Sequence, residues 1–141
     1  MAGNMSDEQR SDGVLIKVSN GLVSLHKEQF GRGPTRARAN FAGSDTLVCT
    51  LEDALLPAER MMVQIGDEQR VREARGAMQA ATADKFVRVV EEVVQRKVTA
   101  FSSAVDPAKE VVWEIFNFEP LAHGDGDGDS ANELSDGQRK P

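Results

Sequence analysis

Arginine and glycine crowd the segment between residues 28 and 41, which reads EQFGRGPTRARANF. Guanidinium groups bind phosphate or carboxylate through two parallel hydrogen bonds, and a glycine-rich loop can offer backbone N–H groups to an anion. The segment therefore predicts a site for an anion or a partner, formed by Arg32, Arg36 and Arg38.

The same segment also has a structural interpretation, in which it only connects a helix to a strand. Gly31 suits the left-handed position after a helix, and Gly33 and Pro34 would stop that helix and turn the chain. Arg36 and Arg38 would then lie on a solvated strand face. The loop lacks the Lys-Ser/Thr ending of a P-loop, and it precedes a strand instead of a helix N-terminus. Both interpretations stay open at the level of the sequence.

Other reactive side chains are few. His26 and His123 are the two histidines, and Cys49 is the single cysteine. Two distant histidines and one cysteine make no zinc site, and Cys49 alternates with leucines as a buried strand residue does. We expect His26 to be a structural residue at the edge of a helix face and Trp113 to belong to the core. The sequence therefore predicts no catalytic residue, no metal site and no cofactor.

The acidic run near the C-terminus has part of the spacing of a calcium loop. Three aspartates fall at positions 1, 3 and 5 of an EF-hand loop, but positions 6 and 12 hold Ser130 and Asp136 in place of Gly and Glu. No helical pattern flanks the run. We interpret residues 121–141 as a disordered acidic tail.

The charge of the chain, −6 at pH 7, is concentrated at its ends. Residues 11–120 hold 16 acidic and 14 basic side chains and are close to neutral. Because a duplex-binding domain usually has a clear basic excess, we do not expect nucleic acid as a partner. A chain of 141 residues fits one domain, which we predict at 11–120, after a flexible segment 1–10.

The sequence gives no sign of a membrane span. No apolar run approaches the roughly 18 residues that cross a bilayer. The N-terminus MAGNMSDEQR lacks the apolar region of a signal peptide. We therefore expect a cytoplasmic protein, peripheral at the inner membrane only through a partner.

Hydrophobic periodicity predicts the elements that position these residues. Apolar residues at helical spacing indicate a helix that begins at Ser6 or nearer Ser11 and ends at Phe30. Alternation in TRARANF and TLVCTLE, separated by AGSD, indicates a β-hairpin. A second hairpin joins KVTAFSSAV to EVVWEIFNF through the turn DPAK, and we expect its heavily apolar last strand to be central or well covered.

A long helical region lies between the two hairpins. It begins with Pro57 at the first helical position, where the missing N–H costs nothing, and runs to about Gln95. We predict two helical pieces with a break or bend near residues 80–84, and Gly66 is a second candidate for the break.

The predicted order is αββ-α(α)-ββ, which favours an α+β fold with a four-stranded antiparallel sheet and helices packed on one face. The tetrapeptide DEQR occurs at 7–10 and at 67–70 and hints at two αββ halves, although four residues are too few to establish a duplication. Because such a sheet has two edges, we expect a homo-oligomer, a dimer formed through an edge or the helix face.

With these elements placed, the chain resembles a bacterial family over roughly residues 12–119. The stretch LVSLHKEQFGRGPTRARANFAGSDTLVCTLEDALLPAER, with its Gly-Arg-Gly-Pro loop, is similar to the first half of the MpsC family. VREAR and VEEVVQRKVTAFSSAVDPAKEVVWEIFNF are similar to the second half. One departure is Gln95, which stands where the family commonly has a glycine before Arg-Lys-Val.

The family, formerly a domain of unknown function, is named for a sodium-translocating system that generates membrane potential and is linked to bicarbonate supply. The resemblance implies a non-catalytic accessory or interaction component whose partner is a membrane transport subunit. The alternative is a regulatory domain that binds an anion or nucleotide through Arg32, Arg36 and Arg38.

Overall fold

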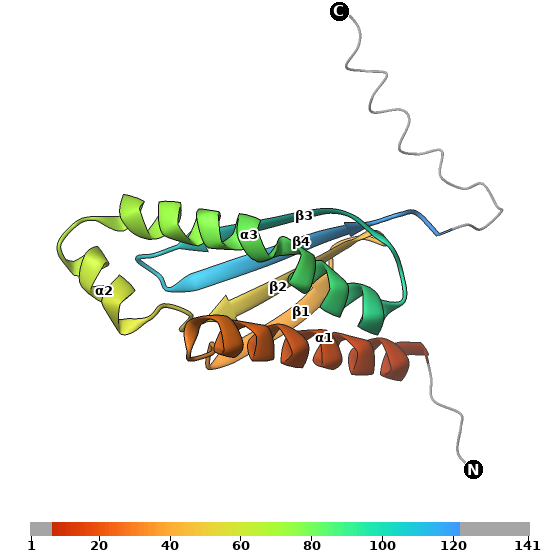
Figure 1. Ribbon diagram of the computed structural model, residues 1–141. Helices are drawn as coiled ribbons and strands as arrows, with labels where there is room; N and C mark the ends of the chain where they lie inside the picture. The colour runs from red at the N-terminus through yellow and green to blue at the C-terminus, as the bar shows by residue number, and fades with distance from the viewer. Residues whose placement is uncertain (1–6, 122–141) are drawn as a thin grey trace, which may run out of the picture.

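A computed structural model describes residues 7–121 and has an α+β fold (Figure 1). The elements are α1 (Asp7–Phe30), β1 (Arg36–Phe41), β2 (Thr46–Glu52), α2 (Pro57–Gln64), α3 (Glu68–Val94), β3 (Val98–Asp106) and β4 (Val111–Phe118). The four strands pair antiparallel in the order β1-β2-β4-β3. The predicted fold class, both hairpins and the central position of the last strand are confirmed.

The two ends of the chain were predicted to be a flexible segment and an acidic tail. Of the residues covered by these two predictions, the structure describes only 7–10 and 121. Residues 7–10 belong to α1, which begins one residue after the predicted cap at position 6. The run with partial calcium-loop spacing also lies outside the described residues.

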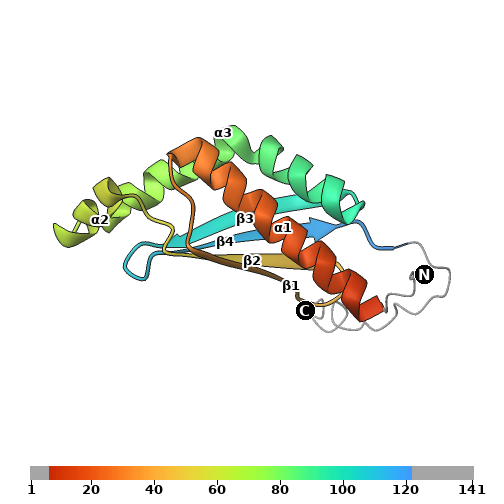
Figure 2. The same cartoon turned by 90° about the horizontal axis from the view of Figure 1, so that it is seen from below.

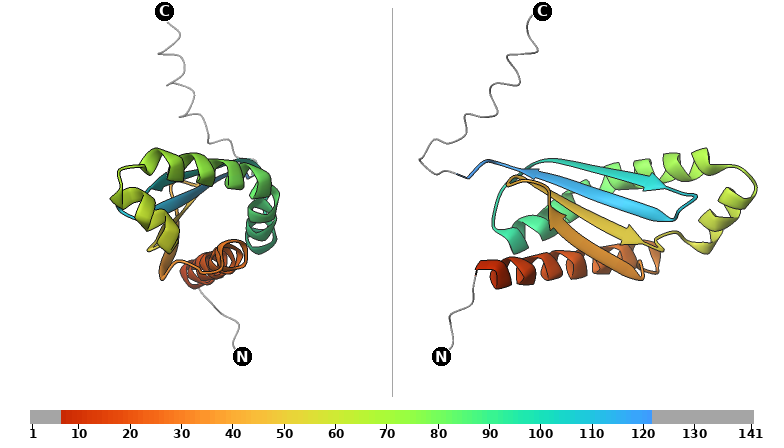
Figure 3. Two further views of the ribbon diagram at one scale, coloured as in Figure 1. Left: turned by 60° about the vertical axis from the view of Figure 1, so that its left-hand side comes forward. Right: turned by 180° about the vertical axis from the view of Figure 1, so that it is seen from behind.

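The sheet has a covered face and an open face. Figure 2 shows α1 and α3 crossing the same face, and Figure 3 shows α2 beyond one end of the strands. Along β4, Val112, Glu114 and Phe116 are buried beneath the helices, whereas Trp113 and Ile115 point to the opposite side and stay partly exposed. We call that opposite side the outer face. The prediction that Trp113 belongs to the core is wrong, because strand alternation turns it away from the helices.

Close packing of α1 on α3 depends on a glycine. A Cβ atom built at Gly21 would lie 2.8 Å from Cγ1 of Val89, which is closer than such atoms approach. Val18 and Leu22 beside it are fully buried against Val90 and the strands. Glycine at position 21 lowers the intrinsic stability of α1, but its missing side chain allows the two helices to meet above the sheet.

The helical region between the hairpins breaks at Gly66, and residues 80–84 stay within one continuous helix. Gly66 has φ +83, a conformation that glycine adopts readily, and α3 is continuous from Glu68 onward. Within the predicted break, the hydroxyl of Thr82 donates to the carbonyl of Met78 at 2.9 Å, which is a bond internal to the helix and typical of a bend. Figure 1 shows that α3 changes direction along its length without interruption.

The two copies of DEQR occupy matching places in the fold. The first begins α1, and the second comprises the N-terminal cap Asp67 and the first residues of α3. Each long helix is followed by a hairpin, and the second strands of the hairpins, β2 and β4, pair at the centre of the sheet. The described residues therefore contain two helix–strand–strand units joined by α2.

The ends of α3 and α1 give predictions of opposite sign. Gln95 ends α3 at φ 63, a left-handed conformation that costs a non-glycine residue roughly 1–2 kcal/mol. We expect Gln95→Gly to raise the free energy of unfolding by about 0.5–1 kcal/mol, since the greater freedom of the unfolded chain offsets part of the gain.

The matched variant is Gly31→Ala at φ +87, which we expect to lower the free energy of unfolding by about 1 kcal/mol. Urea unfolding followed by circular dichroism measures both changes. An unchanged or lower urea midpoint for Gln95→Gly would show that its backbone is not strained.

Candidate functional site

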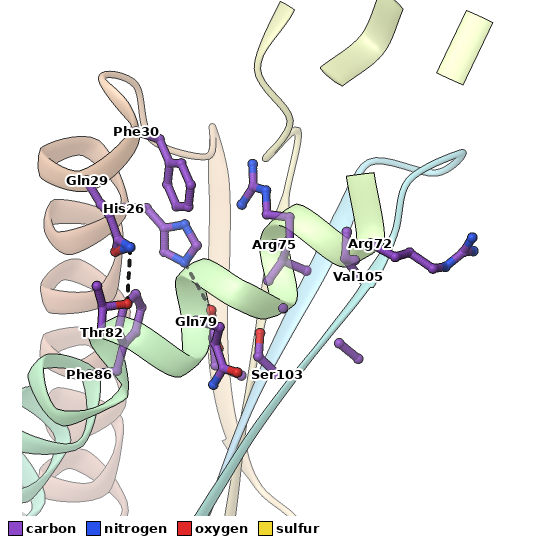
Figure 4. A pocket seen from close by; sticks show the side chains of 14 residues that line it. His26, Gln29, Phe30, Arg72, Arg75, Gln79, Thr82, Phe86, Ser103 and Val105 are labelled. Carbon is purple, nitrogen blue, oxygen red and sulfur yellow. Dashed lines mark hydrogen bonds and ion pairs between the residues drawn. The ribbon is translucent and has the colours of Figure 1, made fainter. Parts of the chain in front are cut away.

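A pocket of about 310 Å³ lies between α1, α3 and the covered face of β3 and β4. Figure 4 shows its side chains: His26, Gln29 and Phe30 come from α1, Thr82 and Phe86 from α3, and Ser103 from β3. The volume is at the lower end of the range for sites that bind small organic molecules. The pocket combines apolar walls with polar groups.

A buried pair of polar side chains lies in the pocket wall. Nε2 of His26 lies 3.1 Å from Oε2 of Glu114, and the two side chains are only 3% and 2% exposed. The His26 ring stacks on Phe30 at a centroid distance of 5.6 Å and meets Phe86 edge-on at 5.4 Å. Two aromatic rings and a carboxylate therefore fix the position of the imidazole.

The pairing determines what each nitrogen of His26 can do. Because a carboxylate only accepts hydrogen bonds, we assign to His26 the neutral tautomer in which Nε2–H donates to Glu114. Among residues 7–121, His26 makes no other polar contact, and its Nδ1 is not one of the fully buried atoms without a partner. In this tautomer Nδ1 is an acceptor on a residue that lines the pocket, able to accept a hydrogen bond from a bound molecule.

Only one of the two carboxylate oxygens of Glu114 has a hydrogen-bond partner among the described residues. Its Oε1 atom is fully buried and has no hydrogen-bond partner among the described residues. Glu114 pairs across the sheet with Cys49 on one side and Ser103 on the other. The centre of the covered face therefore carries a carboxylate, a thiol and a hydroxyl among apolar side chains.

Arg75 forms one end of the pocket, but its guanidinium group is already bound. Nε and Nη2 donate to the two carboxylate oxygens of Glu59, each at 2.7 Å, and Nη2 also donates to the carbonyl of Ala54 at 2.8 Å. The guanidinium carbon lies 4.2 Å from the centroid of the Phe30 ring. Arg75 therefore stabilises the pocket wall, and the N–H groups of its Nη1 are the only guanidinium donors without a hydrogen bond within residues 7–121.

The environment of Glu59 shifts its acidity. Burial by itself raises the pKa of Glu59, but the hydrogen bonds from Arg75 and from the backbone N–H of Leu56, with the positive charge of Arg75, outweigh burial and lower that pKa below its ordinary value. The same carboxylate caps the first turn of α2. Glu59 thus serves both the pocket wall and the start of a helix.

The Gly-Arg-Gly-Pro loop lies outside the pocket and connects α1 to β1. The backbone N–H of Gly31 donates to the carbonyl of Lys27 at 2.9 Å, and its φ of +87 ends the helix. Gly33 lies so close to α1 that a Cβ atom there would be 3.2 Å from the carbonyl oxygen of Val23. Pro34 is buried. This geometry matches the structural interpretation of the loop.

Arg32, one of the three predicted site residues, holds the connection between β2 and α2. It donates to the carbonyls of Asp53 and Leu55 at 3.2 and 2.7 Å, and to the Asp53 carboxylate at 3.1 Å. Burial raises the pKa of Asp53, but hydrogen bonds from Thr35 and Arg32 and the charges of Arg32 and Arg60 lower it overall. Arg32 is therefore occupied by the chain itself.

Arg36 and Arg38 lie together on the outer face, away from the pocket. Both bind the carboxylate of Glu52, at 3.3 and 3.2 Å, and their side chains are 70% and 55% exposed. The structure thus brings these two arginines together and separates them from Arg32. Binding of an anion at these positions stays a prediction.

Sequence reasoning missed the pocket residues Glu114 and Arg75, and Glu59, which binds Arg75. An acid inside the apolar strand EVVWEIFNF was the available signal for Glu114. Large apolar residues occupy both the odd and the even positions of that strand, so the alternation does not reveal which face is buried. His26 was expected to be structural, and its pairing with a residue 88 positions away leaves no trace in the sequence.

The lowered pKa of Glu59 makes stability depend on pH. A carboxylate whose pKa falls on folding contributes its full stabilisation at pH values above its ordinary pKa. That stabilisation is lost as the pH falls from the ordinary pKa through the lowered pKa of the folded state. We expect the urea midpoint of the native sequence to fall between about pH 5 and pH 3, and to fall less in Glu59→Gln. Glu73→Gln, an exposed position on α3, is the matched control. Identical pH dependence in Glu59→Gln and the native sequence would contradict this role.

Cys49 provides a second test of the covered face. Burial, with the charge of Glu114 as a smaller contribution, raises the pKa of the Cys49 thiol to about 12. Because the thiolate is the reactive form, we expect no reaction with Ellman's reagent at pH 8 in the folded protein and complete reaction in urea. Ser44→Cys, in the exposed hairpin turn, should react at once. Rapid labelling of Cys49 in the folded protein would show that the sheet centre is open.

Comparison with known proteins places the chain in a family. Residues 14–120 match the family described as Na+-translocating membrane potential-generating system (MpsC). None of the curated proteins and none of the solved structures compared with the chain matches it. No helix within residues 7–121 is long and apolar enough to span a bilayer. Because the family match extends over well more than half of the chain, this protein belongs to the MpsC family.

Proposed function

We propose that this chain is a non-catalytic accessory component that binds a membrane-embedded subunit of an ion or bicarbonate transport system. The description of the family, a sodium-translocating system that generates membrane potential, supports a role in such a system. We assign the ion pathway to the partner and a binding role to this chain. The predicted cytoplasmic location and the predicted dimer stay predictions.

The outer face of the sheet is the surface that we assign to this partner. β4 turns Val111, Trp113 and Ile115 toward it, and Val48 of β2 lies opposite Ile115 in the strand register. The helices lie on the other side of the sheet (Figure 2). An antiparallel sheet that faces water normally presents polar residues there, whereas an apolar strip around a tryptophan is typical of the centre of a protein interface.

Arginines border this apolar strip. Arg38 is paired with Thr50 in the register, and Thr50 is paired with Trp113. Arg36 and Arg38 share the single carboxylate of Glu52, so one positive charge remains at the edge of the strip. This combination of an apolar centre and a basic edge carries the proposal. It fits a partner segment with an apolar side chain flanked by an acidic residue.

Site-specific crosslinking tests the proposed surface. The photoreactive residue p-benzoylphenylalanine replaces Thr50 on the outer face or, as the matched control, Asp84 on the exposed side of α3. We expect position 50 to crosslink to an integral membrane protein in native membranes and position 84 to give no such product. Adding Trp113→Ser to the position 50 variant should reduce the crosslink severalfold, since the tryptophan supplies the apolar centre.

Three outcomes would contradict the proposal. They are the absence of a crosslinked membrane protein at position 50, a membrane product from position 84 alone, and a product from position 50 that contains only a second copy of this chain. The last outcome would instead assign the outer face to the predicted dimer. Circular dichroism of each variant checks that the sheet is retained.

A further inference from the structure

We propose that the pocket between α1, α3 and the sheet binds a small, uncharged organic molecule whose hydroxyl or N–H group donates a hydrogen bond to Nδ1 of His26. This site is separate from the surface proposed for the membrane partner, because the pocket lies on the covered face and that surface on the outer face. Either proposal can fail without the other.

The imidazole of His26 is held as an acceptor before any ligand arrives. Oε2 of Glu114 accepts the hydrogen bond from Nε2–H at 3.1 Å, and the rings of Phe30 and Phe86 restrict the imidazole from two directions. The pair is almost entirely buried, so little water competes for Nδ1. A preorganised acceptor of this kind favours a ligand with a donor group, since binding then requires no rearrangement of the side chain.

Further polar groups in the pocket have no hydrogen-bond partner among the described residues. The amide of Gln79 and the hydroxyl of Ser103 line the pocket, and neither side chain makes a hydrogen bond within residues 7–121. Thr82 is different, because its hydroxyl accepts from Gln29 at 3.1 Å and donates to the helix backbone. Gln79 and Ser103 are therefore the groups free to bind a second polar atom of the ligand (Figure 4).

The charges and walls of the pocket indicate the class of ligand. The guanidinium of Arg75 is paired with Glu59, and the carboxylate of Glu114 accepts a hydrogen bond from the neutral imidazole of His26. A charged ligand would lose its hydration on entering the pocket, which is costly. The remaining wall includes aromatic and branched apolar side chains, namely Phe30, Phe86, Val105 and Val112. The ligand is therefore an uncharged molecule with an apolar body that fits about 310 Å³.

A pair of probes that differ only in the donor tests the proposal. 2-Naphthol carries a hydroxyl donor, and 2-methoxynaphthalene has nearly the same shape without one. We expect isothermal titration of the full chain to show that the naphthol binds about tenfold more tightly than its methyl ether, because the ether leaves the buried acceptor unpaired. Equal affinity for the two probes, or no binding of the naphthol, would overturn the proposal.

A double variant removes the acceptor while it preserves the fold. His26→Phe with Glu114→Met replaces the buried pair by apolar residues of similar size, a change that is often neutral or stabilising. We expect this variant to bind both probes with equal affinity. A preference for the naphthol that survives in the variant would show that His26 is not the acceptor.

Nitrogen NMR of His26 gives a direct readout in the native sequence, which decides the matter even where the double variant does not fold. His26 and His123 are the only histidines, so His123→Gln identifies the His26 signals. We expect 2-naphthol, and not its methyl ether, to shift the Nδ1 resonance of His26. An Nδ1 resonance that stays unchanged at saturating naphthol would exclude the proposed hydrogen bond.

Discussion

The guanidinium group of Arg75 joins α3 to the end of α1, to α2 and to the connection between β2 and α2. From α3 it binds both oxygens of Glu59 in α2 and the carbonyl of Ala54 after β2, and it lies over the ring of Phe30 at the end of α1. A cation buried to this degree is tolerated only where every one of these contacts is made. The angle at which α1 ends, the start of α2 and the end wall of the pocket therefore depend on one side chain.

The consequences of this constraint continue into the core. Phe30, held against Arg75, stacks on His26, and His26 in turn binds Glu114 at the centre of the sheet. An apolar side chain at position 114 would bury more surface at lower cost, since the carboxylate is left with one oxygen unpartnered. The chain thus maintains a polar pair beneath its helices where packing alone would favour a hydrocarbon, and a cavity remains beside that pair.

The local parts of the fold could be predicted because single residues decide them. Gly31 ends α1, Pro57 begins α2, and alternation defines both hairpins. The sequence predictions were wrong where contacts between residues distant in the sequence decide the structure. The alanine-rich segment at 80–84 stays helical while Gly66 turns the chain, and Trp113 faces outward although its strand is central. Both choices depend on which surface the helices cover, and that information is not local.

The candidate site was less accessible to sequence reasoning than the fold. The arginine-rich loop attracted attention by its composition, yet Arg32 binds the chain's own carbonyls. The pocket instead uses residues from four elements, and no catalytic or ligand-binding motif marks them in the sequence. Isolated residues such as Glu114 acquire chemical meaning only when their neighbours in space are known, because a lone acid in a strand is usually solvated.

Strand β4 acts as a partition with a different surface on each side. Successive residues point to opposite faces, so the side chain of Glu114 belongs to the pocket while its chain neighbours Trp113 and Ile115 belong to the outer face. β4 is also hydrogen-bonded along both of its edges, to β2 and to β3. A β4 residue therefore cannot shift without moving its neighbours, and the pocket and the outer face are mechanically coupled through this strand.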